Sequence, residues 1–229
     1  MKILALDTAS SWCAAAVYDS GTDMVLAQIS ENIGKGHAEV LMDYIERAMA
    51  QSAVVMTELD RVAVNIGPGS FTGVRIGVSA ARGFALALER PAIGISAFDA
   101  LACEVAISHP GQPVLVLFEA HRGEIYAQAF GADMLAITGP MVLSRDEALA
   151  LVRQQSSETV LAGSAAAALN EILAGTFSTA QTGPTGRIGT FAKLAALREP
   201  GAAPKPLYMR GPDVKPQTGF ALPRKVGGE

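Results

Sequence analysis

Short apolar runs separated by polar turns open the chain and predict a meander of three strands. The runs cover Lys2–Asp7, Cys13–Tyr18 and Met24–Ser30. Runs this short, bounded by turn residues, are typical of strands rather than helices. The stretch Asp19–Asp23 contains a glycine and predicts a hairpin turn between the second and third runs. In Ala38–Met49 the apolar residues change to helical spacing, which predicts the first helix.

Strands and helices alternate over the next part of the chain. An apolar run at Arg61–Val64 predicts a buried strand, and a helical pattern follows it to about Leu88. Pro91–Ser96 predicts another strand, and Ser96 is placed to cap a helix through Ile107. Alternation of this kind indicates a sheet covered by helices.

The best candidate for a domain boundary is Ser108–Pro113, where two prolines and a glycine fall together. Beyond it, strands are expected at 114–118, 124–131 and 159–162, and helices at 145–155, from 164 onward and at 187–198. The order of elements resembles that before the boundary, although the sequence itself shows no clear repeat. We therefore predict two related α/β halves, 1–108 and a smaller 109–200, and a partly flexible Pro/Gly-rich tail, 201–229.

Composition places the chain among globular proteins. Half of its 229 residues are apolar and 17% are charged, a balance unlike that of disordered chains. The net charge of −4 argues against a protein that grips nucleic acid by itself, since such proteins carry a basic excess. Cys13 and Cys103 lack the spacing of a metal site and favour reduced thiols in the cytoplasm. No window approaches the roughly 20 apolar residues of a membrane span.

A glycine-rich block, Gly67–Gly77, joins the strand at 61–64 to the following helix. A turn of this kind directs free N–H groups to one point, which is how many proteins hold phosphate. Gly67, Gly69 and Ser70, with Asp7, are therefore candidates for a nucleotide or anion site. However, no Gly-Lys-Ser/Thr follows the block, and the loop after Asp7 contains no glycine. A turn cap is the stronger interpretation of Asp7.

The helix that follows the block has a face of small residues. Gly73, Gly77, Ala80 and Gly83 recur at steps of four, three and three. Each glycine inside a helix costs up to roughly 1 kcal/mol relative to alanine, so the close approach of another backbone must offset this cost. That backbone belongs either to the chain's own sheet or to a second protein, and the residues alone leave both open.

Several segments of the chain resemble the TsaB (YeaZ-type) family, a relative of the TsaD/Kae family. They are Met1–Ser10, Gly67–Gly77 and Ala120–Tyr126, and Pro206–Arg210 fits the same pattern. The resemblance covers most of the chain and is strongest in the first half. It implies an α/β, actin/sugar-kinase/Hsp70-like (ASKHA) fold with two halves. It also implies a subunit of the bacterial machinery that makes threonylcarbamoyladenosine next to the anticodon of tRNA.

The resemblance implies the role of a partner rather than of a catalyst. In this family the small-residue helix and the helix before it form the surface that pairs with a second subunit. The interface residues expected from it are Gly73, Gly77, Ala80, Gly83, Leu41 and Ile45. The variant Gly77→Leu is then expected to block docking and to leave the monomer folded.

The partners that the resemblance implies are a TsaD-type catalytic subunit and a TsaE-type ATPase. Alone, the chain is expected to form a homodimer. Contact with tRNA is expected only through the complex, and the location is expected to be cytoplasmic, without a membrane.

No catalytic residue, metal site or cofactor of its own is expected. The similar TsaD subunit holds a metal through a His-x-x-x-His pair, whereas His37, His109 and His121 lie far apart in this sequence. ATP or ADP with magnesium at a subunit junction stays open. Two alternatives remain: an ATP-dependent phosphotransferase of the same fold, motivated by Asp7 and the glycine-rich block, and a metalloprotease, which the missing pair disfavours.

Overall fold

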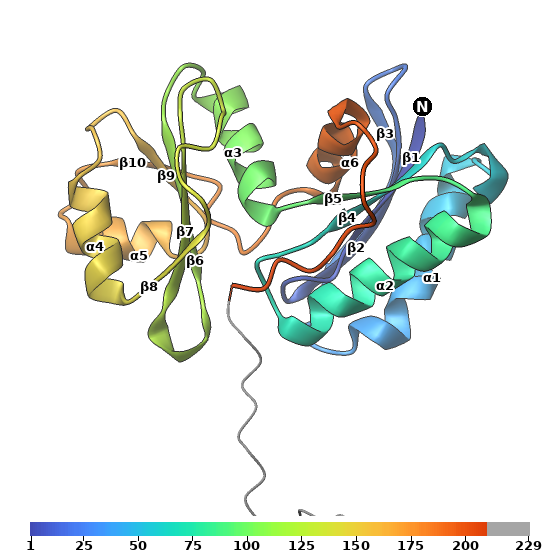
Figure 1. Cartoon of the computed structure of the whole chain (residues 1–229), viewed down its shortest axis with the longest axis horizontal. Coiled ribbons are helices and arrows are strands. Elements are labelled where there is room, and N and C mark those ends of the chain that lie inside the picture. Colours follow the sequence, from blue (N-terminus) through green and yellow to red (C-terminus); the bar gives the residue numbers. More distant parts are fainter. Residues whose placement is uncertain (210–229) are drawn as a thin grey trace, which may run out of the picture.

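Five strands form the sheet of the first half in the computed structural model, which describes residues 1–209 (Figure 1). They are β1 Lys2–Asp7, β2 Trp12–Asp19, β3 Met24–Asn32, β4 Arg61–Asn65 and β5 Ala92–Ile95. Their order in the sheet is β3-β2-β1-β4-β5. Strands β1 to β3 form the antiparallel meander predicted from the apolar runs, and β4 pairs in parallel with both β1 and β5.

The second half contains another sheet of five strands. They are β6 Val114–Glu119, β7 Ile125–Phe130, β8 Met141–Leu143, β9 Val160–Ala162 and β10 Ser178–Ala180. Strands β6 to β8 are antiparallel, and β9 pairs in parallel with β6 and β10. The order β8-β7-β6-β9-β10 repeats the order of the first sheet strand for strand. The predicted fold class of two related α/β halves is therefore confirmed.

Three helices follow the strands of each half at equivalent points. They are α1 His37–Ser52, α2 Phe71–Leu88 and α3 Ala97–Ser108, then α4 Arg145–Arg153, α5 Ala166–Ile172 and α6 Ile188–Leu197. Two 3-10 turns, η1 Met56–Glu58 and η2 His121–Gly123, complete the described elements. Helices α1 and α2 cover one face of the first sheet, and α4 and α5 cover one face of the second.

The third helix of each half packs on the sheet of the other half (Figure 1). Phe98, Leu101 and Val105 of α3 pack with Val114 and Val116 of β6. In the opposite direction, α6 packs on the first sheet and also contacts α3. The boundary expected between residues 108 and 109 stays a prediction, and helices are exchanged across it.

Strand β1 shows how the first sheet is buried on both faces. Leu4 and Leu6 pack with the residues of α1 and α2, whereas Ile3 and Ala5 pack with those of α6. Successive side chains of a strand point to opposite faces, so a continuous apolar run is required where both faces are covered. The end of β1 is thereby held in the middle of the molecule, where Asp7 and the turn after it lie.

Helix α2 is the one described helix with the length and composition of a membrane span, with a mean hydropathy of 1.2. It nevertheless contains Arg75 and Arg82, and its Val74, Val78 and Ala81 belong to the core of the first half. Of its residues 28% are buried, and four further apolar residues are partly buried against the same core, whereas Leu86 is 82% exposed. Residues 210–229, for which the sequence predicts a partly flexible tail, lie outside the described residues, and so does Arg210 of the Pro206–Arg210 segment.

Candidate functional site

The glycine-rich block forms the loop from β4 into the first turns of α2. Gly67 has a φ of +101°, a value that favours glycine, and its N–H donates to Oδ1 of Asn65 at 2.8 Å. Ser70 caps the helix, since its Oγ accepts from the N–H of Gly73 at 3.2 Å. The local geometry is thus the strand–turn–helix connection that the sequence predicts.

The glycines of the block are needed because α2 packs directly on the turn after β1. A Cβ on Gly69 would overlap the carbonyl oxygen of Ala9, and a Cβ on Gly73 would overlap that of Thr8. The Thr8 hydroxyl donates to the Gly73 carbonyl at 2.7 Å, and a Cβ on Gly77 would lie 2.6 Å from the Thr8 Oγ1. Close packing within the chain therefore offsets the cost of both glycines, by the backbone of Thr8 at Gly73 and by the side chains of Thr8 and Val64 at Gly77.

This packing corrects part of the expected interface. Gly73 and Gly77 are buried against Thr8 and do not lie on an outer surface. Leu41 and Ile45 are fully buried in the core of the first half, where they pack with strands of their own sheet. Since Gly77→Leu would drive a side chain into Thr8, it is expected to unfold the monomer and not to block docking of a folded one.

Asp7 is a buried carboxylate, 2% exposed, whose oxygens accept three hydrogen bonds. The Ala9 N–H donates to Oδ1 at 2.8 Å, as a turn cap requires, and Asn65 Nδ2 donates to the same oxygen at 3.0 Å. The Thr185 hydroxyl donates to Oδ2 at 2.6 Å. Burial raises the pKa of Asp7, and these hydrogen bonds act in the opposite direction. Asp7 thus ties β4 and the segment before α6 to the end of β1.

A cleft of about 690 Å³ lies beside the glycine-rich loop and is lined by residues of both halves. The first half contributes Ser10 and Ser11 after β1, the loop 34–37 before α1, and residues 68–70 with the first turns of α2. The second half contributes Phe118, Glu119, Ala120, His121, Tyr126 and Ser164. Segments singled out in the sequence, namely the start of the chain, the glycine-rich block and Ala120–Tyr126, therefore meet at one cleft.

The predicted anion-site residues do not all face this cleft. Gly69 and Ser70 line it, but the described lining of a separate cavity of about 250 Å³ contains Asp7, beside Glu104 of α3 and the loop 181–187. Gly67 lies in neither described lining. The structure thus separates the carboxylate from the N-terminus of α2, which the sequence interpretation placed in one site.

Sequence reasoning missed two features of these cavities. Glu104 is buried in α3 and accepts from the Arg187 N–H at 2.6 Å and from the Thr190 hydroxyl at 2.8 Å. The available signal was an acidic residue in the middle of an otherwise apolar helix, since Asp99, the other acidic residue of α3, lies in its first turn. His37 and His121 line the cleft from opposite halves, and no spacing in the sequence pairs them.

The outward sides of α1 and α2 form what we call the α1/α2 face, made of Met42, Ser79, Gly83 and Leu86. The two helices lie side by side and contact each other. Met42 is 55% exposed and Leu86 is 82% exposed. A Cβ on Gly83 would meet no atom within 4 Å, whereas Ala80 is half-buried against the core. Of the three glycines of this helix, Gly83 is the one at which an added Cβ would meet open space among the described residues.

Among residues 1–209, no group of three His, Cys, Asp or Glu side chains is placed to hold a metal ion.

Comparison with known proteins gives a family match over residues 25–196, to TsaD, described as tRNA N6-adenosine threonylcarbamoyltransferase. The chain is 35% identical to the tRNA threonylcarbamoyladenosine biosynthesis protein TsaB of Escherichia coli K12, over 58% of this chain and 56% of that protein. It is 32% identical to the TsaB of Haemophilus influenzae, over 55% and 52%. The aligned regions thus span only about half the length of these curated relatives.

Solved structures support the fold. A protein of Pseudomonas aeruginosa with similarity to peptidase YEAZ superposes with a TM-score of 0.75 at 22% identity, covering 91% of this chain and 99% of that one. YeaZ from the same organism gives 0.71 at 23% identity, covering 86% and 92%. The repeated sheet order and these neighbours confirm the ASKHA-like fold. Because the family match extends over more than half of the sequence, the chain belongs to the TsaD family and is related within it to the TsaB proteins.

Proposed function

We propose that the chain is a non-catalytic subunit that binds and supports a TsaD-type transferase in forming threonylcarbamoyladenosine next to the tRNA anticodon. The name of the Escherichia coli relative supports the pathway. The observation that carries the docking role is the exposure of Leu86 of α2 and Met42 of α1, with the open position of Gly83 on α2. A TsaE-type ATPase, and tRNA reached only through the complex in the cytoplasm, complete the proposed assembly.

The α1/α2 face has the properties that a docking surface needs. When a partner covers large apolar side chains that project into water, their removal from water favours binding. Full burial of a leucine or methionine contributes about 1.5–3 kcal/mol. Leu86 and Met42 are available for this. Gly83 has open space above it, so the backbone of a partner can approach α2 closely there. A second copy of the chain would compete for the same face when the transferase is absent, which accounts for the proposed homodimer.

The surroundings of Asp7 favour a non-catalytic role for the chain. Its carboxylate oxygens accept hydrogen bonds from Ala9, Asn65 and Thr185, all groups of the chain itself. Of the two glycines that would cradle a phosphate in the first interpretation, Gly69 lies against Ala9, and Gly67 lies against Val74 and Leu207. Both features serve the packing of the chain itself.

The variant Gly83→Leu tests the docking role directly. It adds a bulky side chain where the monomer has open space, and leucine favours helix more than glycine does, so the monomer is expected to stay folded. Binding to the TsaD-type subunit, measured by calorimetry and by co-elution, is expected to be lost.

The matched control is Gly139→Leu, which adds the same side chain at an open position of the second half. This variant should bind the TsaD-type subunit as the unmodified chain does. Equal binding by Gly83→Leu and Gly139→Leu would contradict docking through the α1/α2 face.

The cleft favours one second candidate, an ATP-dependent phosphotransferase. It is large enough for a nucleotide, and hydroxyl groups of Ser10, Ser70 and Ser164 line it. This candidate requires the isolated chain to bind ATP tightly with magnesium, whereas a nucleotide at a subunit junction requires the partner as well. Calorimetric titration of the chain with magnesium and ATP, with and without the TsaD-type subunit, separates these cases.

A further inference from the structure

Residues 204–209, which we call the strap, contact both halves of the molecule. Pro204 is buried beside Gly94 of β5, where an added Cβ would lie 3.1 Å from the proline ring. The Leu207 N–H donates to the carbonyl oxygen of Ile66 at 2.7 Å, in the loop between β4 and α2. Leu207 and Met209 also pack against the apolar cluster formed by α3, β6, β7 and β9. The strap is therefore fixed to the first half and to the apolar cluster that β6, β7 and β9 of the second half share with α3.

Tyr208 of the strap completes a stack on the first turns of α2. The Nε of Arg75 donates to the Tyr208 hydroxyl oxygen at 2.7 Å. The Arg75 guanidinium lies 3.7 Å from the centroid of the Phe71 ring and 5.4 Å from that of Tyr208. Phe71 is 45% exposed and Tyr208 is 47% exposed, so burial alone does not hold them. Cation–π contacts and the hydrogen bond join the strap to α2.

The strap reaches the two walls of the cleft. On one wall, Ser70 and Thr72 belong to the loop and helix that Leu207 and Tyr208 contact. On the other wall, Phe118 belongs to the cluster that Leu207 and Met209 contact. Moving the halves apart would break one of these two sets of contacts.

We propose that the strap is a clamp that sets the spacing of the two halves and positions α2 for its partner. Tyr208 and Arg75 are then positioning residues, which act on docking through the first turns of α2 and not by touching the partner. The effect on the spacing of the halves is independent of the proposed function. Only the effect on docking rests on it.

Hydrogen exchange of the full chain tests the clamp with the variant Tyr208→Ala. Exchange at the Leu207 amide and across residues 66–76 is expected to be about tenfold faster, because a cation–π contact and a charge-assisted hydrogen bond are lost. Exchange in β1 and β2 should not change. Tyr208→Phe keeps the ring but not the hydroxyl acceptor. Its exchange rates should lie between those of the unmodified chain and those of Tyr208→Ala. Unchanged exchange in Tyr208→Ala would overturn the clamp.

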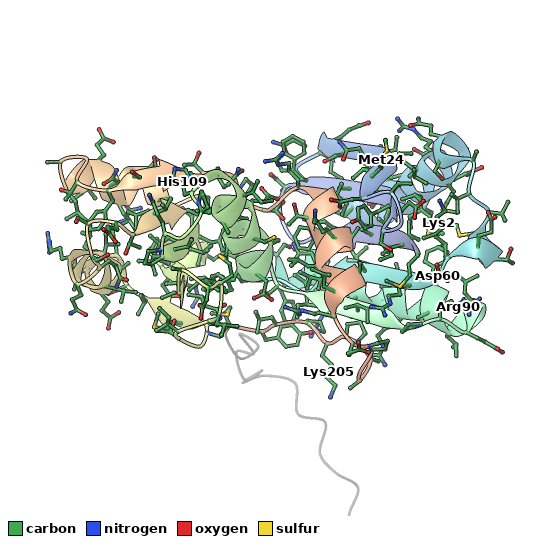
Figure 2. All side chains as sticks on the ribbon, turned by 90° about the horizontal axis from the view of Figure 1, so that it is seen from above. Lys2, Met24, Asp60, Arg90, His109 and Lys205 are labelled. Carbon is green, nitrogen blue, oxygen red and sulfur yellow. The ribbon has the colours of Figure 1, made fainter. Side chains whose placement is uncertain are left out.

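Lys205→Ala is the matched control within the strap, since Lys205 is exposed and points away from the body of the molecule (Figure 2). It should exchange as the unmodified chain does, and equal acceleration in both variants would overturn the assignment to Tyr208.

Docking gives the second readout. Affinity for the TsaD-type subunit is expected to fall several-fold in Tyr208→Ala, and unchanged affinity would overturn the positioning of α2. If the unmodified chain binds no such subunit while Tyr208→Ala still exchanges faster, the proposed function fails and the clamp stands.

Discussion

At the scale of single residues, Asp7 and the glycines of the block owe their identities to neighbours distant in sequence. The turn cap from Asp7 to Ala9 could be predicted, because both partners are local. The hydrogen bonds of Asp7 with Asn65 and Thr185 could not, since nothing in the local pattern names a partner across the fold. The same applies to Gly69, which is required by the carbonyl of Ala9. A glycine-rich sequence therefore indicates close approach without saying what approaches.

Substitutions of Asp7 separate a structural carboxylate from a catalytic one. Asp7→Ala removes the acceptor of three hydrogen bonds and is expected to lower the free energy of unfolding by about 3 kcal/mol. Asp7→Asn keeps an acceptor for Ala9 and Asn65 and should retain most of the stability and all of the docking. Denaturant unfolding measures the first effect and calorimetry the second. Loss of docking in a folded Asp7→Asn protein would contradict the structural role.

The pKa of Asp7 gives a prediction for pH. Burial raises the pKa in the folded state above that in the unfolded chain, so the folded state binds the proton more tightly. Ionisation of Asp7 therefore costs stability above its folded pKa, and this cost is removed as the pH falls through the folded pKa toward the pKa of the unfolded chain. Compared with Asp7→Asn, the unmodified chain should gain free energy of unfolding on acidification. The quantity to follow is the free energy of unfolding of the unmodified chain minus that of Asp7→Asn. If this quantity does not increase from neutral to mildly acid pH, the shift is contradicted.

At the scale of elements, the apolar pattern predicted most helices and strands, including the exact bounds of β1. It missed β8 and β10, which have three residues each, although β9 of the same length was predicted. Three residues are too few for an alternation pattern to decide the assignment. In α1 the family resemblance, and not the apolar period, places Leu41 and Ile45 on an interface. An apolar stripe marks contact, and here the contact is with the chain's own sheet.

Two alanine substitutions in α2 should have opposite effects. Gly73→Ala forces a methyl group into the Thr8 carbonyl and is expected to cost several kcal/mol of stability. Gly83→Ala meets no atom and should stabilise the helix by up to about 1 kcal/mol. Thermal unfolding measures both the loss of stability in Gly73→Ala and the gain of stability in Gly83→Ala. Equal effects would show that close packing does not explain the glycines.

At the scale of the whole molecule, the two halves repeat one sheet order and exchange their third helices. The repeat could be predicted from the order of elements. The exchange could not, because the apolar residues of α3 and α6 fit a sheet face without specifying which sheet. The exchanged helices, the hydrogen bonds of Asp7 and the strap together hold the halves around one cleft. The same arrangement leaves the α1/α2 face open to a partner.

Reconstituted formation of threonylcarbamoyladenosine on tRNA tests the docking role most directly. The assay contains TsaD-type and TsaE-type subunits with the unmodified chain, with Gly83→Leu, or with neither. Modification is expected with the unmodified chain and is expected to be lost both without it and with Gly83→Leu. Full modification in the absence of the chain would contradict its role as the supporting subunit.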